Sequence, residues 1–71
     1  MSISAITAKN LAQLTNIEIT PESSYSAITV EEIVKIASSK GFHVKIHVSK
    51  YSAISIEKFV KLGGNNVTIV I

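Results

Sequence analysis

The chain has 71 residues, 46% of them hydrophobic, and its formal net charge is +2. This length predicts one domain covering residues 1–71, and the apolar content excludes an intrinsically disordered chain. Without cysteine the chain cannot form disulfides or thiolate metal sites, and its short apolar runs exclude a membrane span. The first residues lack the basic and apolar blocks of a secretory signal, so we expect a cytoplasmic protein.

The charges are distributed unevenly along the chain. Residues 1–32 carry one lysine and four glutamates, a net charge of −3, whereas residues 33–71 carry six lysines and one glutamate, a net charge of +5. Such an asymmetry is found in proteins that bind an acidic partner and in proteins that associate head to tail. It is also typical of an ordinary solvated surface.

A nine-residue string occurs three times, as SAITAKNLA from residue 4, SAITVEEIV from residue 26 and SAISIEKFV from residue 52. In the first copy Thr7 is a suitable helix N-cap, because its hydroxyl can accept a hydrogen bond from a free N–H of the first turn. Ile6 and Leu11 have the spacing of a hydrophobic staple. Helical spacing continues through Ala8, Leu11, Ala12 and Leu14. A strand is then predicted where two isoleucines flank Glu18, and Pro21 ends it.

The second copy repeats this pattern. Thr29 is the predicted N-cap, Glu32 completes a capping box with it, and Ile28 and Ile33 form the staple. The apolar stripe is Val30, Ile33, Val34 and Ile36. Gly41 is placed to end this helix. The strand that follows alternates Val44, Ile46 and Val48 with Lys45 and His47.

The third copy predicts the last unit. Ser55 is the expected N-cap, and Ile54 and Phe59 have the staple spacing. The apolar stripe is Ile56, Phe59, Val60 and Leu62, and Gly63 is the expected helix end. The strand alternates Val67, Ile69 and Ile71 with Thr68 and Val70. Tyr25 and Tyr51 precede the second and third copies, where an aromatic ring packs at the turn into the helix or anchors a partner.

The repeated unit, a capped short helix followed by a strand, predicts the fold. The units cover residues 4–20, 26–48 and 52–71, and strands joined through helices run parallel with right-handed crossovers. Strict alternation indicates a sheet covered on one face. We therefore predict an α/β fold of three tandem helix–strand repeats, with a three-stranded, mainly parallel sheet and all helices on one face. The leucines and asparagine of leucine-rich repeats are missing, so the repeat identifies no family.

The uncovered sheet face is the predicted interaction surface. It is expected to carry His43, Lys45, His47, Glu18, Thr68 and Val70. Metal binding by the two histidines is not expected, because residues four apart on a strand are separated by roughly 13 Å. No nucleophile-elbow motif frames a serine, which leaves hydrolase activity a minor alternative. No cofactor or catalytic residue is predicted.

These observations favour a small non-enzymatic protein that acts as a protein-interaction or self-assembly module. The last strand carries neither lysine nor proline to discourage pairing with another chain. Pairing there, or stacking of the uncovered sheet faces of two copies, is expected to give a homodimer. The alternative is nucleic-acid binding through the basic second half of the chain. Against it stand the small net charge, the absence of arginine and the absence of an aromatic residue among the exposed strand positions.

Overall fold

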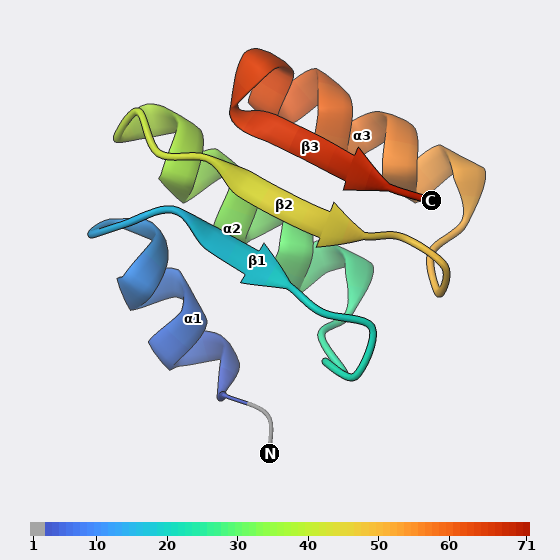
Figure 1. Cartoon of the computed structure of the whole chain (residues 1–71), viewed down its shortest axis with the longest axis horizontal. Coiled ribbons are helices and arrows are strands. Elements are labelled where there is room, and N and C mark those ends of the chain that lie inside the picture. Colours follow the sequence, from blue (N-terminus) through green and yellow to red (C-terminus); the bar gives the residue numbers. More distant parts are fainter. Residues whose placement is uncertain (1–2) are drawn as a thin grey trace.

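The computed structural model describes residues 3–71 of the chain. Helices and strands alternate along it, and Figure 1 shows them coloured by sequence. In chain order they are α1 (Ala5–Ala12), β1 (Ile17–Ile19), α2 (Ala27–Ser39), β2 (Val44–His47), α3 (Ala53–Gly63) and β3 (Val67–Val70), with a single 3₁₀ turn, η1 (Gly64–Asn66), before the last strand. No helix within residues 3–71 has the length and apolar content that crossing a bilayer requires.

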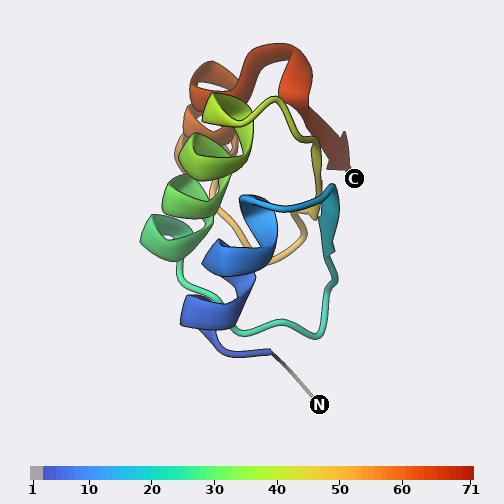
Figure 2. The same cartoon turned by 90° about the vertical axis from the view of Figure 1, so that its left-hand side faces the viewer.

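The strands form one parallel sheet in the order β1-β2-β3. Glu18 lies beside Lys45, which in turn lies beside Thr68, and His47 lies beside Val70. Figure 2 shows the helix layer on one side of the sheet, and α2 lies between α1 and α3 in Figure 1. The predicted α/β fold with three helices and a three-stranded parallel sheet is confirmed.

The core lies between the helix layer and the inner face of the sheet. Its largest fully buried side chains come from α2, α3 and β2: Phe59, Ile33, Ile46, Val30, Val34 and Val44. The ring of Tyr51 packs edge-on against Phe59, with 5.3 Å between the ring centroids and 85° between the planes. Because each helix is too short to be stable alone in water, this packing is what holds the helices.

Each helix begins three residues earlier than the sequence predicted. The N-caps are Ser4, Ser26 and Ser52, whose side-chain oxygens accept hydrogen bonds at 3.2 Å from the backbone N–H groups three residues later. The predictions of Thr7, Thr29 and Ser55 as caps are therefore wrong. Both hydroxyl residues of each repeat are good cap formers, and the chain uses the first.

The predicted staples and the capping box are also wrong. Ile6, Ile28 and Ile54 lie inside the first helical turn and are 74%, 69% and 70% exposed, so they do not pack at the helix entry. Glu32 pairs instead with Lys9 at 2.6 Å, which links α2 to α1. The position before each true cap is occupied by Ile3, Tyr25 or Tyr51, and both tyrosines pack against the core.

One of the two predicted helix ends is confirmed. Gly41 follows α2 with a φ of +81°, in the left-handed region that favours glycine. Gly63 is instead the last residue of α3, and the positive φ falls on Gly64, at +54°. Position 63 has no room for a side chain, because a Cβ there would overlap the side chain of Val67 and lie 2.8 Å from Cγ1 of Val34.

Three members of the predicted apolar stripes are exposed. Leu14 is 70% exposed because α1 ends at Ala12, before the stripe is complete. Val60 and Leu62 are 44% and 37% exposed. Both belong to α3, which lies at one end of the helix layer.

Candidate functional site

The six residues of the predicted interaction surface come together on the uncovered face of the sheet. Glu18 projects from β1, Lys45 and His47 from β2, and Thr68 and Val70 from β3, with His43 directly before β2. The alternation of the strands sends the intervening side chains of Ile19, Val44 and Ile46 into the core. The alternation along each strand explains why these six side chains lie on one face. Which of them contact one another depends on the register between strands.

Two diagonal contacts cross this face. Nε2 of His47 lies 2.6 Å from Oε2 of Glu18, and Nε2 of His43 lies 2.5 Å from Oγ1 of Thr68. Each joins side chains that are two residues apart in the register rather than directly opposite. The polar groups of the face are thus largely engaged with one another, and Lys45 lies exposed between the two pairs.

The contact with His47 sets the ionisation of Glu18. The hydrogen bond from His47 is the main cause that lowers the pKa of the Glu18 carboxyl; desolvation opposes it, and the positive charge of Lys45 on the adjacent strand lowers the pKa further. Glu18 is therefore held as a carboxylate. An imidazole beside a carboxylate is one part of a general-base arrangement, but neither histidine is hydrogen-bonded to a serine among residues 3–71.

The face gives no clear metal site. Within the part of the chain that the structure describes, no three histidine, aspartate or glutamate side chains are close enough to hold an ion together. A shallow depression of about 360 Å³ lies on the face beside Asn16, Glu18, His43 and Lys45. The Asn16 side-chain oxygen accepts a hydrogen bond from the His43 backbone at 2.8 Å, which fixes the start of β2.

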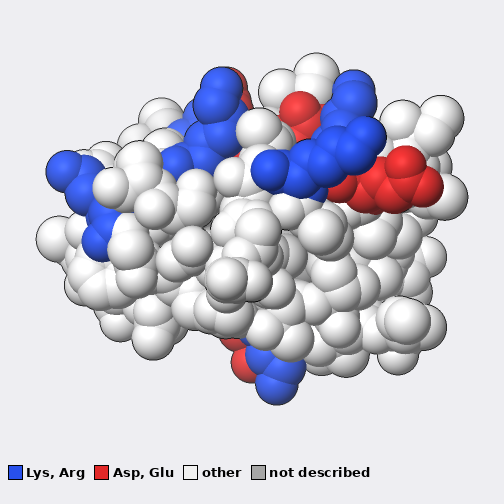
Figure 3. Space-filling view, turned by 90° about the horizontal axis from the view of Figure 1, so that it is seen from above, with Lys and Arg blue, Asp and Glu red and all other residues white. Residues whose placement is uncertain are grey.

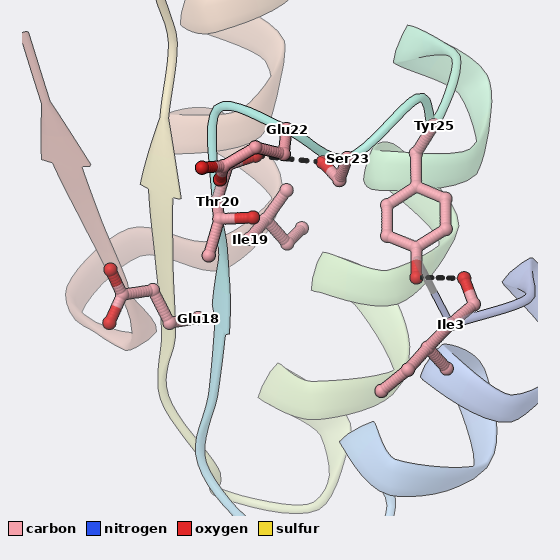
Figure 4. A pocket seen from close by; sticks show the side chains of 7 residues that line it. All are labelled: Ile3, Glu18, Ile19, Thr20, Glu22, Ser23 and Tyr25. Carbon is pink, nitrogen blue, oxygen red and sulfur yellow. Dashed lines mark hydrogen bonds between the residues drawn. The ribbon is translucent and has the colours of Figure 1, made fainter. Parts of the chain in front are cut away.

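A second hollow, of about 310 Å³, lies where β1 ends and the chain turns toward α2 (Figure 4). The carboxyl ends of parallel strands are the usual place for ligands in α/β proteins. Here, however, the Tyr25 hydroxyl donates to the Ile3 carbonyl at 2.5 Å, and the Ser23 hydroxyl donates to the Thr20 carbonyl at 2.9 Å. Figure 4 shows the Glu18 carboxylate pointing away from Tyr25 and Ile3. These polar groups fix the loop and do not converge on a common point.

The remaining surface of interest is the outer edge of β3. The strand reads Val-Thr-Ile-Val and carries no charge. Figure 3 looks onto α3 and β3 from above: lysine and glutamate side chains lie along the upper margin, a lysine lies at the left, both charges appear again at the lower margin, and the band between them is uncharged. Ile71, directly after β3, is fully exposed.

The backbone groups along this edge alternate in direction. The Val48 N–H donates to the Val70 carbonyl at 3.1 Å, so Thr68 and Val70 turn their backbone groups toward β2 and the residues between them turn theirs outward. The outward N–H of Val67 is used by the Gly64 carbonyl. The Val67 carbonyl and both backbone groups of Ile69 have no partner among residues 3–71. Sequence reasoning identified this strand as an edge but could not show which backbone groups are free.

The other edge of the sheet is different. β1 has only three residues, Glu18 is at its middle, and Pro21 follows closely. The Ile17 N–H donates to the His43 carbonyl at 3.0 Å, so Glu18 is the residue of β1 that turns its backbone outward. A short strand with a charge and a nearby proline is the usual protection of a sheet edge. The protected edge is β1 and the unprotected edge is β3.

In comparisons with known proteins, no family model, no curated protein and no solved structure matches the chain significantly.

Proposed function

We propose that the chain is a non-enzymatic protein-interaction module, and that its contact surface is the edge of β3, to which an extended segment of another polypeptide adds as a further strand. The observation that carries this proposal is the row of unpaired backbone groups at Val67 and Ile69 on an uncharged strand. A strand that adds to such an edge gains main-chain hydrogen bonds along its length, and its alternate side chains find apolar surface on the helix side.

The side chains around the edge support strand addition. Val67 and Ile69 point toward the helix layer but are only half-buried, because no helix lies beyond α3. An added strand would cover the exposed parts of Val67 and Ile69, which their own chain leaves in contact with water. Thr68 and Val70, two members of the predicted interaction surface, belong to the same strand.

The rest of the uncovered face is a weaker candidate for the contact. Glu18 and His47 are bonded to each other, and His43 is bonded to Thr68, so a partner there would have to compete with bonds that already exist. Nucleic acid is favoured less. The chain's four aromatic side chains, Tyr25, Phe42, Tyr51 and Phe59, all pack in or against the core, so none is offered on the sheet for stacking with bases.

The proposal is tested by titrating the isotope-labelled protein with a synthetic peptide of sequence Val-Thr-Ile-Val-Ile while amide resonances are followed by NMR. We expect the largest shifts at the amides of residues 67–71 and slower hydrogen exchange at the Ile69 N–H. A peptide with N-methylated isoleucine is the matched control, because it keeps the side chains but cannot form the main-chain ladder.

Three results would contradict the proposal. The first is the absence of any shift along β3 at millimolar peptide when the labelled chain is dilute enough to sediment as a monomer. The second is a set of shifts centred on Glu18, Lys45 and His47, which would place the contact on the uncovered face instead. The third is equal shifts with the methylated peptide, which would show that apolar contact, and not strand addition, is responsible.

A further inference from the structure

We infer that the strand added to β3 is β3 of a second copy of this chain, in antiparallel orientation about a two-fold axis that passes midway between the two copies of Ile69. This inference rests on the function proposed above and names its partner. It joins the two three-stranded sheets into one continuous sheet, with all helices on the same face.

The uncharged edge favours contact with itself. In a two-fold contact the same patch is placed against its own copy, so any charge in it meets a like charge. β3 carries no charge, and the band around it is uncharged in Figure 3. All four of its residues are β-branched, the class most favoured in strands.

Head-to-tail pairing of β3 with β1 of the next copy is the alternative that the charge asymmetry of the sequence suggests. The edges argue against it. β1 turns the backbone of Glu18 alone outward, and Pro21 ends the strand soon after. A β3–β1 contact would therefore bring a four-residue strand with free groups against a protected strand of three residues.

The free backbone groups determine the register. In antiparallel pairing the outward-turned residues of one strand must face those of the other, and the two-fold axis lies midway between a residue and its own counterpart. With the axis at Ile69, each Ile69 donates to and accepts from the other, and each Ile71 N–H reaches the Val67 carbonyl of the partner strand. This register uses the groups that the fold leaves free. With the axis at Thr68, Ile69 would face the Val67 N–H, which already donates to Gly64.

The same register sets which side chains meet on the uncovered face. With the axis at Ile69, Thr68 of one copy faces Val70 of the other as a non-hydrogen-bonded pair, whose Cα atoms are about 4.5 Å apart. That separation lies within the range that a disulfide can bridge. Because the chain has no cysteine, a crosslink in a single-cysteine variant can form only between copies.

The experiment oxidises single-cysteine variants under mild conditions and measures the yield of crosslinked dimer on a non-reducing gel. We expect an equimolar mixture of Thr68→Cys and Val70→Cys to crosslink about tenfold faster than either variant alone. Glu18→Cys mixed with Thr68→Cys is the control for head-to-tail pairing and should crosslink no faster than the single variants. All three positions carry side chains outside the core.

Each other outcome overturns the inference. Fastest crosslinking of Thr68→Cys alone would move the axis to Thr68, and fastest crosslinking with Glu18→Cys would establish head-to-tail pairing. Sedimentation of the unmodified chain as a monomer up to about 1 mM would exclude the dimer without recourse to any variant. If the chain stays monomeric but binds the peptide at β3, the proposed function stands and only the identity of the partner is wrong. If neither occurs, both fail.

Discussion

Removal of one cap hydroxyl tests the helix starts most directly. In α2 the Ser26 Oγ accepts a hydrogen bond from the Thr29 N–H at 3.2 Å and lies 3.0 Å from the Thr29 Oγ1. Ser26→Ala removes the acceptor and leaves the Thr29 N–H to water. Replacement of an N-cap hydroxyl by alanine typically lowers the free energy of unfolding by about 1 kcal/mol. For a domain of this size that corresponds to a fall in Tm of about 4–8 °C.

The matched variants at the same helix are Ser26→Asp and Thr29→Ala. Aspartate keeps an acceptor at the cap and adds a negative charge near the helix N-terminus, so its Tm should stay within about 4 °C of the original. Thr29→Ala should lower the free energy of unfolding by no more than about 0.5 kcal/mol, because the Thr29 backbone N–H still donates to Ser26. Thermal unfolding followed by circular dichroism measures all three. A loss of about 1 kcal/mol in Thr29→Ala, with none in Ser26→Ala, would show that the cap is Thr29 after all.

Two further predictions concern packing and charge. Gly63→Ala should lower the free energy of unfolding by about 1–3 kcal/mol, because the added Cβ overlaps Val67 and crowds Val34. Urea unfolding measures this, and an unchanged midpoint would contradict the close approach of Val67 and Val34 to the Gly63 backbone. The folded state holds the pKa of Glu18 below its ordinary 4.5, chiefly through the His47 hydrogen bond, so the stabilisation is present above pH 4.5 and is lost as the pH falls through the folded pKa. The difference in unfolding free energy between the original chain and Glu18→Gln should therefore shrink below pH 4.5, and a difference independent of pH would refute the linkage.

The strands were predictable from the sequence because period-two alternation leaves little ambiguity. Ile17 to Ile19 and Val67 to Val70 form strands as expected, and Glu18 and Thr68 project from the uncovered face. The helix starts were predicted three residues late because each repeat offers two hydroxyl residues in capping range. The apolar residue that precedes each true cap could have decided between them: Tyr25 and Tyr51 pack against the core, whereas Ile28 lies in the first turn and faces water.

The pairing on the uncovered face could not have been predicted in the same way. The alternation of each strand fixes which side chains share the face, but not which of them meet. That depends on the register between strands. The diagonal contacts of His47 with Glu18 and of His43 with Thr68 follow from that register. Sequence analysis assigned these four side chains to contact with a partner, whereas in the structure they contact one another.

The predicted repeat of helix–strand units agrees with the proposed association at one side of the molecule. In a row of similar units each unit covers the apolar flank of its neighbour, and the unit at the end of the row lacks that cover. The first unit limits its exposure at the sheet with a short strand, Glu18 and Pro21. The last unit has no such protection, because β3 is uncharged and Ile71, which follows it, is fully exposed. At β3 free backbone groups and exposed apolar side chains occur together, and under the proposal a second β3 engages both.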